Sequence, residues 1–116
     1  MDFKLIIALV SDERTEKMIK AAREAGATGA TVITSGRGEG LHSNKTFFGL
    51  TLEGQTDMVL FIVEQHMSRA VLEKVAEAGK FDIKSGGGVV MQLNIEDVIG
   101  LKSQYDFISK EIEDQL

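Results

Sequence analysis

The sequence predicts an α+β domain in which a four-stranded antiparallel sheet has two helices on one face. The main observation is that a strand-helix-strand pattern occurs twice, because a single shift along the chain takes the apolar run at residues 5–10 onto residues 58–63. At 116 residues the chain has the length of one domain, which buries roughly two thirds of its unfolded surface. The same shift takes the apolar face of the first predicted helix, Met18, Ile19 and Ala22, onto Val71, Leu72 and Val75.

The first unit begins with a continuous apolar run at residues 4–10, short enough for a strand that is buried on both faces. Ser11 and Asp12 then offer an N-cap, and apolar residues recur at helical spacing until Gly26. This glycine predicts a left-handed helix end. Residues 30–35 are predicted as the second strand.

The second unit repeats these signals as a strand at 57–64, a helix at 67–78 and a strand at 88–94. Right-handed crossovers place the two strands of each unit parallel to one another. The sequence therefore predicts the βαββαβ, or ferredoxin-like, plan. The open face of such a sheet is expected to be apolar and covered by other subunits.

Helical spacing resumes after Gly100, which predicts an amphipathic C-terminal helix over residues 101–116. This helix is expected to pack against its own domain or a neighbouring subunit, and the alternative is that it binds a partner. Its apolar stripe consists of Leu101, Tyr105, Ile108, Ile112 and Leu116.

Composition excludes several classes of function. The chain has no cysteine, which excludes a disulfide scaffold, a catalytic thiol and thiolate metal sites. It has no signal-peptide pattern and no apolar run near the ~18 residues of a membrane span, so it is expected to be cytoplasmic and not inserted in a membrane. A net charge of −5 argues against binding nucleic acid, although a local arginine or a helix N-terminus can still hold a small anion.

Residues 36–55 show neither helical nor alternating spacing, and unstructured loops beyond ~12–15 residues are usually functional. The segment opens with Gly36-Arg37-Gly38-Glu39-Gly40. These residues can present backbone N–H groups and one guanidinium to an anion. The alternative is a hinge that starts a flexible loop.

The second unit also contains an insertion between residues 80 and 88, which ends in Ser85-Gly86-Gly87-Gly88. Three consecutive glycines before a strand cost backbone entropy and are hard to justify by packing, whereas close approach of a ligand would explain them. The alternative is a slack connector. Both glycine segments are expected at sheet ends, near one another across a subunit interface.

The run Gly26-Ala27-Thr28-Gly29-Ala30-Thr31-Val32, the two glycine segments and the run from Asn94 to Ile99 resemble the PII signal-transduction family. The resemblance extends to about residue 102. It implies a PII-like domain at 1–100, with residues 36–55 as the family's T-loop, followed by the helix at 101–116. The family's members are not enzymes. They are homotrimers that bind adenine nucleotides between subunits and regulate a partner, such as a membrane transporter or an enzyme, through the T-loop.

The resemblance also implies roles for individual residues, with an adenine nucleotide as effector rather than as a required cofactor. Thr31 would approach the base, the start of the T-loop would frame the ligand, and the second glycine segment would cradle phosphate. The implied nucleotide-binding residues are Thr31, Gly36, Arg37, Gly38, Glu39, Val63, Gly86, Gly87, Gly88 and Lys102.

The departures from the family pattern matter for affinity. Gly87 and Val89 stand where the classical family has an acidic residue and a lysine, and Gly100 and Lys102 replace two arginines. Phosphate neutralisation is therefore poorer, so AMP or ADP is expected to be preferred over ATP. The only tyrosine is Tyr105, so the T-loop cannot be uridylylated on tyrosine.

The run from Thr46 to Gly54 resembles the shortened T-loop of carboxysome-associated relatives. Those relatives are linked to inorganic-carbon metabolism and sense adenine nucleotides together with bicarbonate, whereas the classical family serves nitrogen metabolism. The apolar residues of this stretch are Phe47, Phe48, Leu50 and Leu52. They are expected to dock on a partner, to pack on a neighbouring subunit, or to become ordered when ligand binds.

Two other functions share the predicted fold. A regulatory module of the ACT type binds small molecules but usually has a glycine turn after its first strand, where this chain has Ser11-Asp12-Glu13-Arg14. A small enzyme would need His42 or His66 beside a carboxylate such as Glu39 or Glu64. The spacing of the two histidines matches no metal-ligand pattern, so no metal or catalytic site is predicted.

Overall fold

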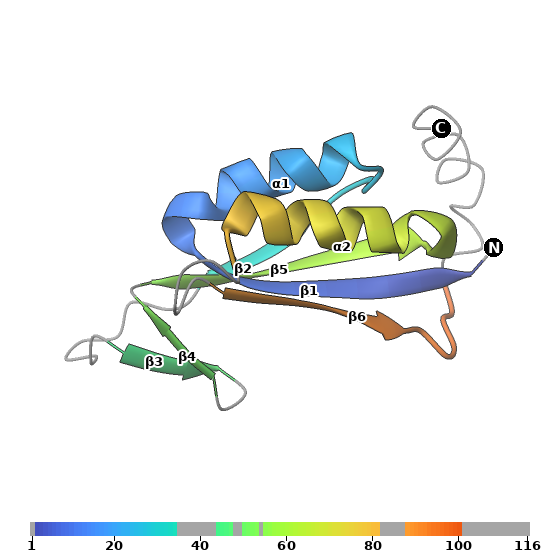
Figure 1. The fold of residues 1–116 in the computed structure, drawn as a ribbon. Helices are drawn as coiled ribbons and strands as arrows, with labels where there is room; N and C mark the ends of the chain where they lie inside the picture. The colour runs from blue at the N-terminus through green and yellow to red at the C-terminus, as the bar shows by residue number, and fades with distance from the viewer. Residues whose placement is uncertain (1, 35–43, 48–49, 54, 82–87, 101–116) are drawn as a thin grey trace.

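The structure is a computed structural model, which describes residues 2–34, 44–47, 50–53, 55–81 and 88–100. Figure 1 shows its two helices side by side on one face of a sheet, which confirms the predicted α+β architecture. The sheet consists of β1 (Phe3–Ser11), β2 (Thr31–Thr34), β5 (Thr56–Glu64) and β6 (Gly88–Asn94). The helices are α1 (Thr15–Glu24), which follows the 3-10 helix η1 (Asp12–Arg14), and α2 (Gln65–Gly79).

The strand order is β2-β5-β1-β6, and all three neighbouring pairs are antiparallel. Each predicted strand-helix-strand unit spans one intervening strand, so that β5 separates β1 from β2 and β1 separates β5 from β6. The two halves are therefore interleaved in one sheet, as the βαββαβ plan requires.

The start of α1 differs from the prediction. Ser11 and Asp12 do not cap an α-helix, because η1 intervenes and neither Ser11 nor Arg14 makes a side-chain cap. The hydroxyl of Thr15 instead donates a hydrogen bond of 2.7 Å to Oδ2 of Asp57 on β5, and both side chains are buried. A carboxylate at a helix N-terminus is electrostatically favourable, so Asp57 stabilises α1 from below.

The predicted left-handed stop of α1 is confirmed, because Gly26 has φ +122°. Gly26 and Ala27 donate to the carbonyls of Arg23 and Ala22, at 3.1 and 2.9 Å, in the pattern of a Schellman motif. A Cβ on Gly26 would lie 2.5 Å from Cε of Met67, so this glycine also lets α2 pack against the end of α1.

Helix α2 starts at Gln65, earlier than predicted, because Glu64 caps it. Oε2 of Glu64 accepts a hydrogen bond of 2.8 Å from the backbone N–H of His66. Gly79 is the last helical residue, and the left-handed position falls one residue later, on Lys80 with φ 53° and ψ 44°.

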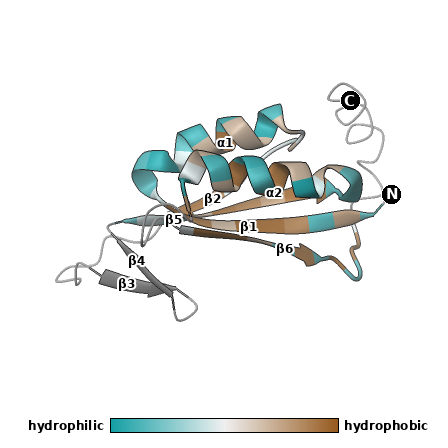
Figure 2. Ribbon diagram, in the orientation of Figure 1, coloured by the Kyte–Doolittle hydropathy of each residue, from teal (hydrophilic) through white to brown (hydrophobic). Residues whose placement is uncertain are grey.

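The core lies between the sheet and the two helices. Met18 and Ala22 of α1 are fully buried, as are Val71 and Val75 of α2, which confirms the repeated apolar face. Figure 2 shows hydrophobic strands beneath helices whose outer surfaces are largely hydrophilic. On the sheet, the helix-facing residues of the core are Ile6, Ala8, Val10, Val59, Phe61 and Val63.

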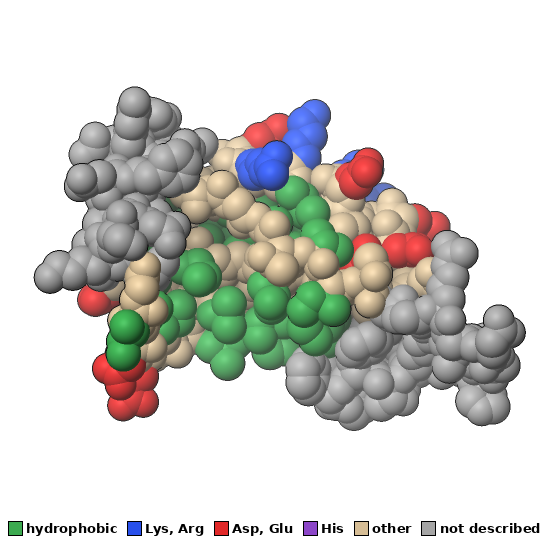
Figure 3. Space-filling model, turned by 180° about the vertical axis from the view of Figure 1, so that it is seen from behind, with side chains coloured by type: hydrophobic (Ala, Val, Ile, Leu, Met, Phe, Trp, Pro, Cys, Tyr) green, Lys and Arg blue, Asp and Glu red, His purple; other side chains and the backbone are tan. Residues whose placement is uncertain are grey.

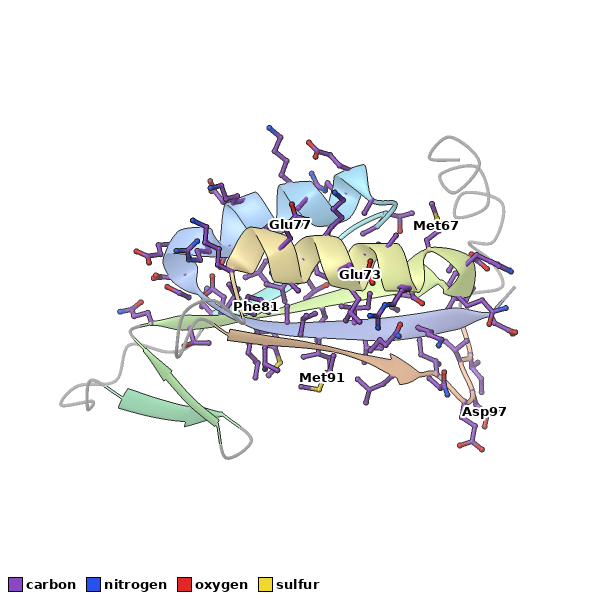
Figure 4. All side chains as sticks on the ribbon, in the orientation of Figure 1. Met67, Glu73, Glu77, Phe81, Met91 and Asp97 are labelled. Atoms are coloured by element: carbon purple, nitrogen blue, oxygen red, sulfur yellow. The ribbon has the colours of Figure 1, made fainter. Side chains whose placement is uncertain are left out.

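The opposite face of the sheet is apolar, and both helices of the described residues lie on the other face. Its side chains form rows across the strands, set by the register. Figure 3 shows hydrophobic side chains gathered in one patch, and Figure 4 shows Met91 on the side of the sheet away from the helices. The rows are Leu93-Leu5-Ile62, Met91-Ile7-Leu60-Thr31 and Val89-Leu9-Met58-Ile33. We name these residues the open face.

The expectation that residues 36–55 lack regular structure is wrong. β3 (Asn44–Phe47) and β4 (Leu50–Glu53) pair antiparallel, with Asn44 opposite Glu53 and Phe47 opposite Leu50. A four-residue strand is too short for its alternation to be distinguished from chance. Pairing between the two strands provides the backbone partners that a single strand would lack.

Several predictions concern segments outside the described residues. These are the start of the T-loop at Gly36, Arg37, Gly38 and Glu39, together with His42, Gly86, Gly87, Lys102 and the helix at 101–116. Neither of the two α-helices that the structure describes is long and apolar enough to cross a membrane.

Candidate functional site on the open face of the sheet

A hollow of about 480 Å³ lies on the open face, where the segment before β2 meets β1 and β5. Its walls are mainly aliphatic, and two threonines add hydroxyl groups, a composition that suits a ligand with both apolar and polar groups. The lining residues are Leu5, Thr28, Gly29, Ala30, Thr31, Leu60 and Ile62. Thr31 is thus the predicted site residue that the structure places in a pocket.

Gly29 in this hollow has no packing reason to be glycine. A Cβ built there would meet nothing within 4 Å, and its φ is not in the left-handed region. Neither the backbone conformation nor packing against the described residues therefore requires glycine at this position.

Gly88 is the opposite case. Its φ is +138°, and a Cβ there would collide with the carbonyl oxygen of Leu9 and lie 2.9 Å from Cε1 of Phe81. The expectation that packing does not justify the glycine run is therefore wrong for Gly88, which lets β6 begin against β1 and Phe81.

The register places Thr34, two residues before the first glycine segment, and Gly88, the last residue of the second, at the same end of the sheet but on opposite edges. Thr34, the last residue of β2, is opposite Asp57, Asp57 is opposite Val10, and Val10 is opposite Gly88. At a strand spacing of about 4.8 Å, the three steps from Thr34 to Gly88 amount to roughly 14 Å. Two intervening strands keep these ends apart within one chain.

Val63 does not offer its side chain to a ligand on the open face. Its side chain is 2% exposed and belongs to the core beneath the helices. Only the backbone of Val63 is available for the nucleotide contact that the resemblance implies.

His66 does lie beside a carboxylate, as an enzymatic role would require. Its Nδ1 is 2.5 Å from Oε1 of Glu64, whose other oxygen caps α2. The imidazole is 79% exposed, and the described residues contain no group of three His, Cys, Asp or Glu side chains that could hold a metal ion. The pair is therefore accounted for by the start of α2.

Sequence reasoning did not single out Leu5, Leu60 and Ile62 as lining residues of a pocket. The available signal was the alternation of the strands, since residues on one face of a strand recur at every second position. That signal identifies the open face but not a hollow within it, because the hollow depends on where the segment before β2 crosses the strands.

Comparison with known proteins agrees with this architecture. The profile of the family described as nitrogen regulatory protein P-II matches residues 3–105. A search of curated proteins found no significant match. Among solved structures, a PII-like signaling protein from Thermus thermophilus is similar, with a TM-score of 0.56 and 20% sequence identity over 82% of this chain and 90% of that chain. At this identity the structural likeness concerns the fold, whereas the family match spans the strands, both helices and both glycine segments. The chain therefore belongs to the P-II family of signal-transduction regulators.

Proposed function

We propose that the chain is a homotrimeric regulator that binds an adenine nucleotide in clefts between its subunits. Support for the assembly comes from the open face, whose rows of aliphatic and methionine side chains would cost free energy in water. Ile33, Ile62 and Leu93 are 50%, 42% and 42% exposed in the single chain. Burial of such a face against copies of itself accounts for its composition, and homotrimers are the form implied by the family.

Support for an intersubunit site comes from the strand ends from which the two glycine segments extend. Thr34 and Gly88 lie on opposite edges of one sheet, so β2 of one copy and β6 of another could bring these ends together between subunits. Strand β2 begins at the hollow and leads into the first glycine segment. A nucleotide lying along β2 would then have its base near Thr31 and its phosphates near the glycines.

Support for AMP or ADP over ATP comes from the residues available to neutralise phosphate. Gly87 and Val89 provide no cation beside the glycine run, and Lys102 offers one flexible ammonium in place of two guanidinium groups. Each further phosphate adds charge that needs a charge-assisted partner. The triphosphate therefore gains less than it would in a site with arginines.

Residues 36–55, the proposed T-loop, would contact the regulated protein. The backbone pairing of β3 with β4 gives part of this segment a defined structure. The resemblance to carboxysome-associated relatives favours bicarbonate as a second effector and a transporter or an enzyme of inorganic-carbon metabolism as the partner. Nitrogen metabolism is the alternative.

Thermal unfolding with AMP, ADP, ATP and cyclic AMP, each with and without bicarbonate, tests the binding of effectors. A ligand present at about a hundred times its Kd stabilises the native state by ~2.7 kcal/mol, a rise in Tm of several degrees. We expect AMP or ADP to give the largest rise. No rise with any nucleotide would refute the proposal, and a rise with free amino acids instead would favour an ACT-like module.

Gly87→Glu tests the glycine segment by placing a side chain and a negative charge where phosphate is proposed. We expect loss of the nucleotide-dependent rise in Tm, while Ala70→Glu, which adds the same side chain on the exposed surface of α2, leaves it unchanged. An unchanged nucleotide response in Gly87→Glu would show that the segment is a connector.

Assembly is tested separately. Leu60→Glu on the open face is expected to reduce the mass in light scattering from trimer to monomer.

A further inference from the structure

A second hollow, of about 350 Å³, lies between the helices, away from the open face. Its lining residues recur at helical spacing on each helix, so the hollow is a groove along the seam between α1 and α2. Figures 1 and 4 show the two helices side by side, with Glu77 on α2. The lining residues are Lys17, Lys20, Ala21, Glu24, Lys74, Glu77, Ala78 and Lys80. We name them the seam groove.

The depth of the seam groove comes from two small side chains. Ala21 on α1 and Ala78 on α2 are both half-buried, whereas the charged residues of the groove are exposed. Larger residues at these two positions would fill the space between the helices. The groove thus has an apolar floor between charged rims, which suits an extended segment better than a compact small molecule.

The charge of the seam groove is opposite to that of the chain. Four lysines and two glutamates line it, although the whole chain has a net charge of −5. Lys74 is 3.9 Å from Glu77, a weak pair between exposed side chains. Lys17, Lys20 and Lys80 form no ion pair with the residues that the structure describes. Within the described part of the chain, these three ammonium groups therefore lack a carboxylate partner.

The backbone conformation of Lys80 is a second observation that supports a binding role for the lysines of the seam groove. It has φ 53° at the end of α2, a left-handed conformation in which glycine is the usual residue and other L-residues are strained. A lysine near a helix C-terminus also interacts with the helix dipole, which is a purely structural benefit. The two explanations differ in whether replacement of Lys80 changes binding.

We propose that the seam groove binds an acidic polypeptide segment of a partner protein. Glu24 and Glu77 lie among the lysines, so an uninterrupted polyphosphate or nucleic-acid backbone would meet two like charges. A polypeptide with spaced Asp and Glu residues can match the lysines and avoid these carboxylates. A second copy of this chain is also acidic overall, so it is the alternative occupant that the mass of the assembly must exclude.

This surface is separate from the proposed nucleotide site. The helices cover one face of the sheet, and the hollow at Thr31 lies on the other. A trimer closed through the open face leaves the seam groove exposed. The inference therefore does not depend on the proposed effector, and either proposal can fail alone.

Fluorescence anisotropy with a labelled oligo-glutamate peptide tests the seam groove. We expect binding at low ionic strength that weakens with added salt, and about a tenfold loss of affinity in Lys17→Glu/Lys20→Glu, because the reversal turns two attractive charge pairs into repulsive ones. The matched control is Arg23→Glu/Arg69→Glu, which reverses two exposed charges outside the groove and changes the net charge by the same amount. An equal loss in the control would show unspecific attraction and overturn the proposal.

Two further arms decide the class of ligand. Tripolyphosphate and single-stranded DNA should compete more weakly than oligo-glutamate, and stronger competition by either would overturn the assignment to a polypeptide. Light scattering should show the same mass for the double variant and the unaltered chain. A change in mass would identify the seam groove as a contact between copies and would also overturn the proposal.

Lys80→Gly separates binding from stability. Relief of the left-handed strain should leave Tm unchanged or raise it, while affinity for oligo-glutamate falls a few-fold. If Lys80 serves only the helix dipole, the variant binds oligo-glutamate as before, and the contribution of Lys80 to the proposal fails. Lys80→Arg, which keeps the positive charge, should retain binding.

Discussion

The two halves of the chain have the same buried helix face but differ where their helices begin. Thr15 of α1 and Ser68 of α2 are equivalent under the internal repeat, and both are buried, at 6% and 3% exposure. Thr15 donates across the domain to Asp57 on β5, whereas Ser68 donates 2.9 Å to the carbonyl of Gln65 in its own helix. One position of the repeat therefore connects the two halves, and the other is satisfied locally.

The helix ends differ in the same way. Gly26 takes the left-handed position after α1, but its counterpart Gly79 remains helical and Lys80 takes that position after α2. A Cβ on Gly79 would collide with the ring of Phe81, so this glycine is retained for packing rather than for a turn. The core therefore constrains the repeated residues alike, whereas the junctions between helix and strand differ between the two halves.

The largest effect on the free energy of unfolding is expected at Gly88, the first residue of β6. Gly88→Ala should cost about 4 kcal/mol of unfolding free energy, because a positive φ and a collision with the Leu9 carbonyl add together. Gly29→Ala, where nothing lies within 4 Å, should cost nothing. Denaturant unfolding at fixed protein concentration measures both. Equal losses of unfolding free energy in the two variants would contradict the proposed packing difference between Gly88 and Gly29.

A smaller loss of stability is expected when buried side chains on the repeated apolar face of the helices are shortened. Met18→Ala should cost about 3 kcal/mol and Val71→Ala about 2 kcal/mol, because each leaves a cavity at a fully buried position. Both variants should shift one cooperative transition, since the halves share one sheet. Two separate transitions in thermal unfolding would show that the halves are independent units.

The smallest effect is expected at the start of the two helices. Thr15→Val should cost about 2 kcal/mol, because Asp57 loses its hydroxyl donor in a buried place, and Thr15→Ser should restore most of it. Ser68→Ala should cost about 1 kcal/mol, because the carbonyl of Gln65 loses only a local donor. Urea denaturation compares the two, and a Ser68 variant as costly as the Thr15 variant would remove the asymmetry.

Much of the fold was predictable because it depends on patterns within single segments. The apolar run of β1, the helical spacing of Met18 and Ala22, and the stop at Gly26 each specify local structure. The misplaced N-cap at Ser11 and the missed hairpin of β3 and β4 have another cause. Thr15 is held by Asp57, which is distant in sequence, and each hairpin strand is only four residues long.

The candidate site was predictable only in part. Thr31 was identified from a family motif, and the structure places it in the hollow with Leu60 and Ile62. Those two residues look like ordinary strand residues in the sequence, because alternation identifies the face on which a residue lies but not which other segments lie beside it. Gly88 was interpreted as a ligand contact, and only the position of Leu9 and Phe81 revealed its packing role.

By itself the sequence determined the two strand-helix-strand units, the apolar face of each helix and the family to which the chain belongs. These properties depend on residues close together in the chain, where periodicity and a motif are sufficient. The tertiary structure decided that β5 and β1 separate the ends of the two glycine segments, and that four lysines from two helices line one groove. Such relations join residues far apart in the sequence, and only the packing of strands and helices brings them together or holds them apart.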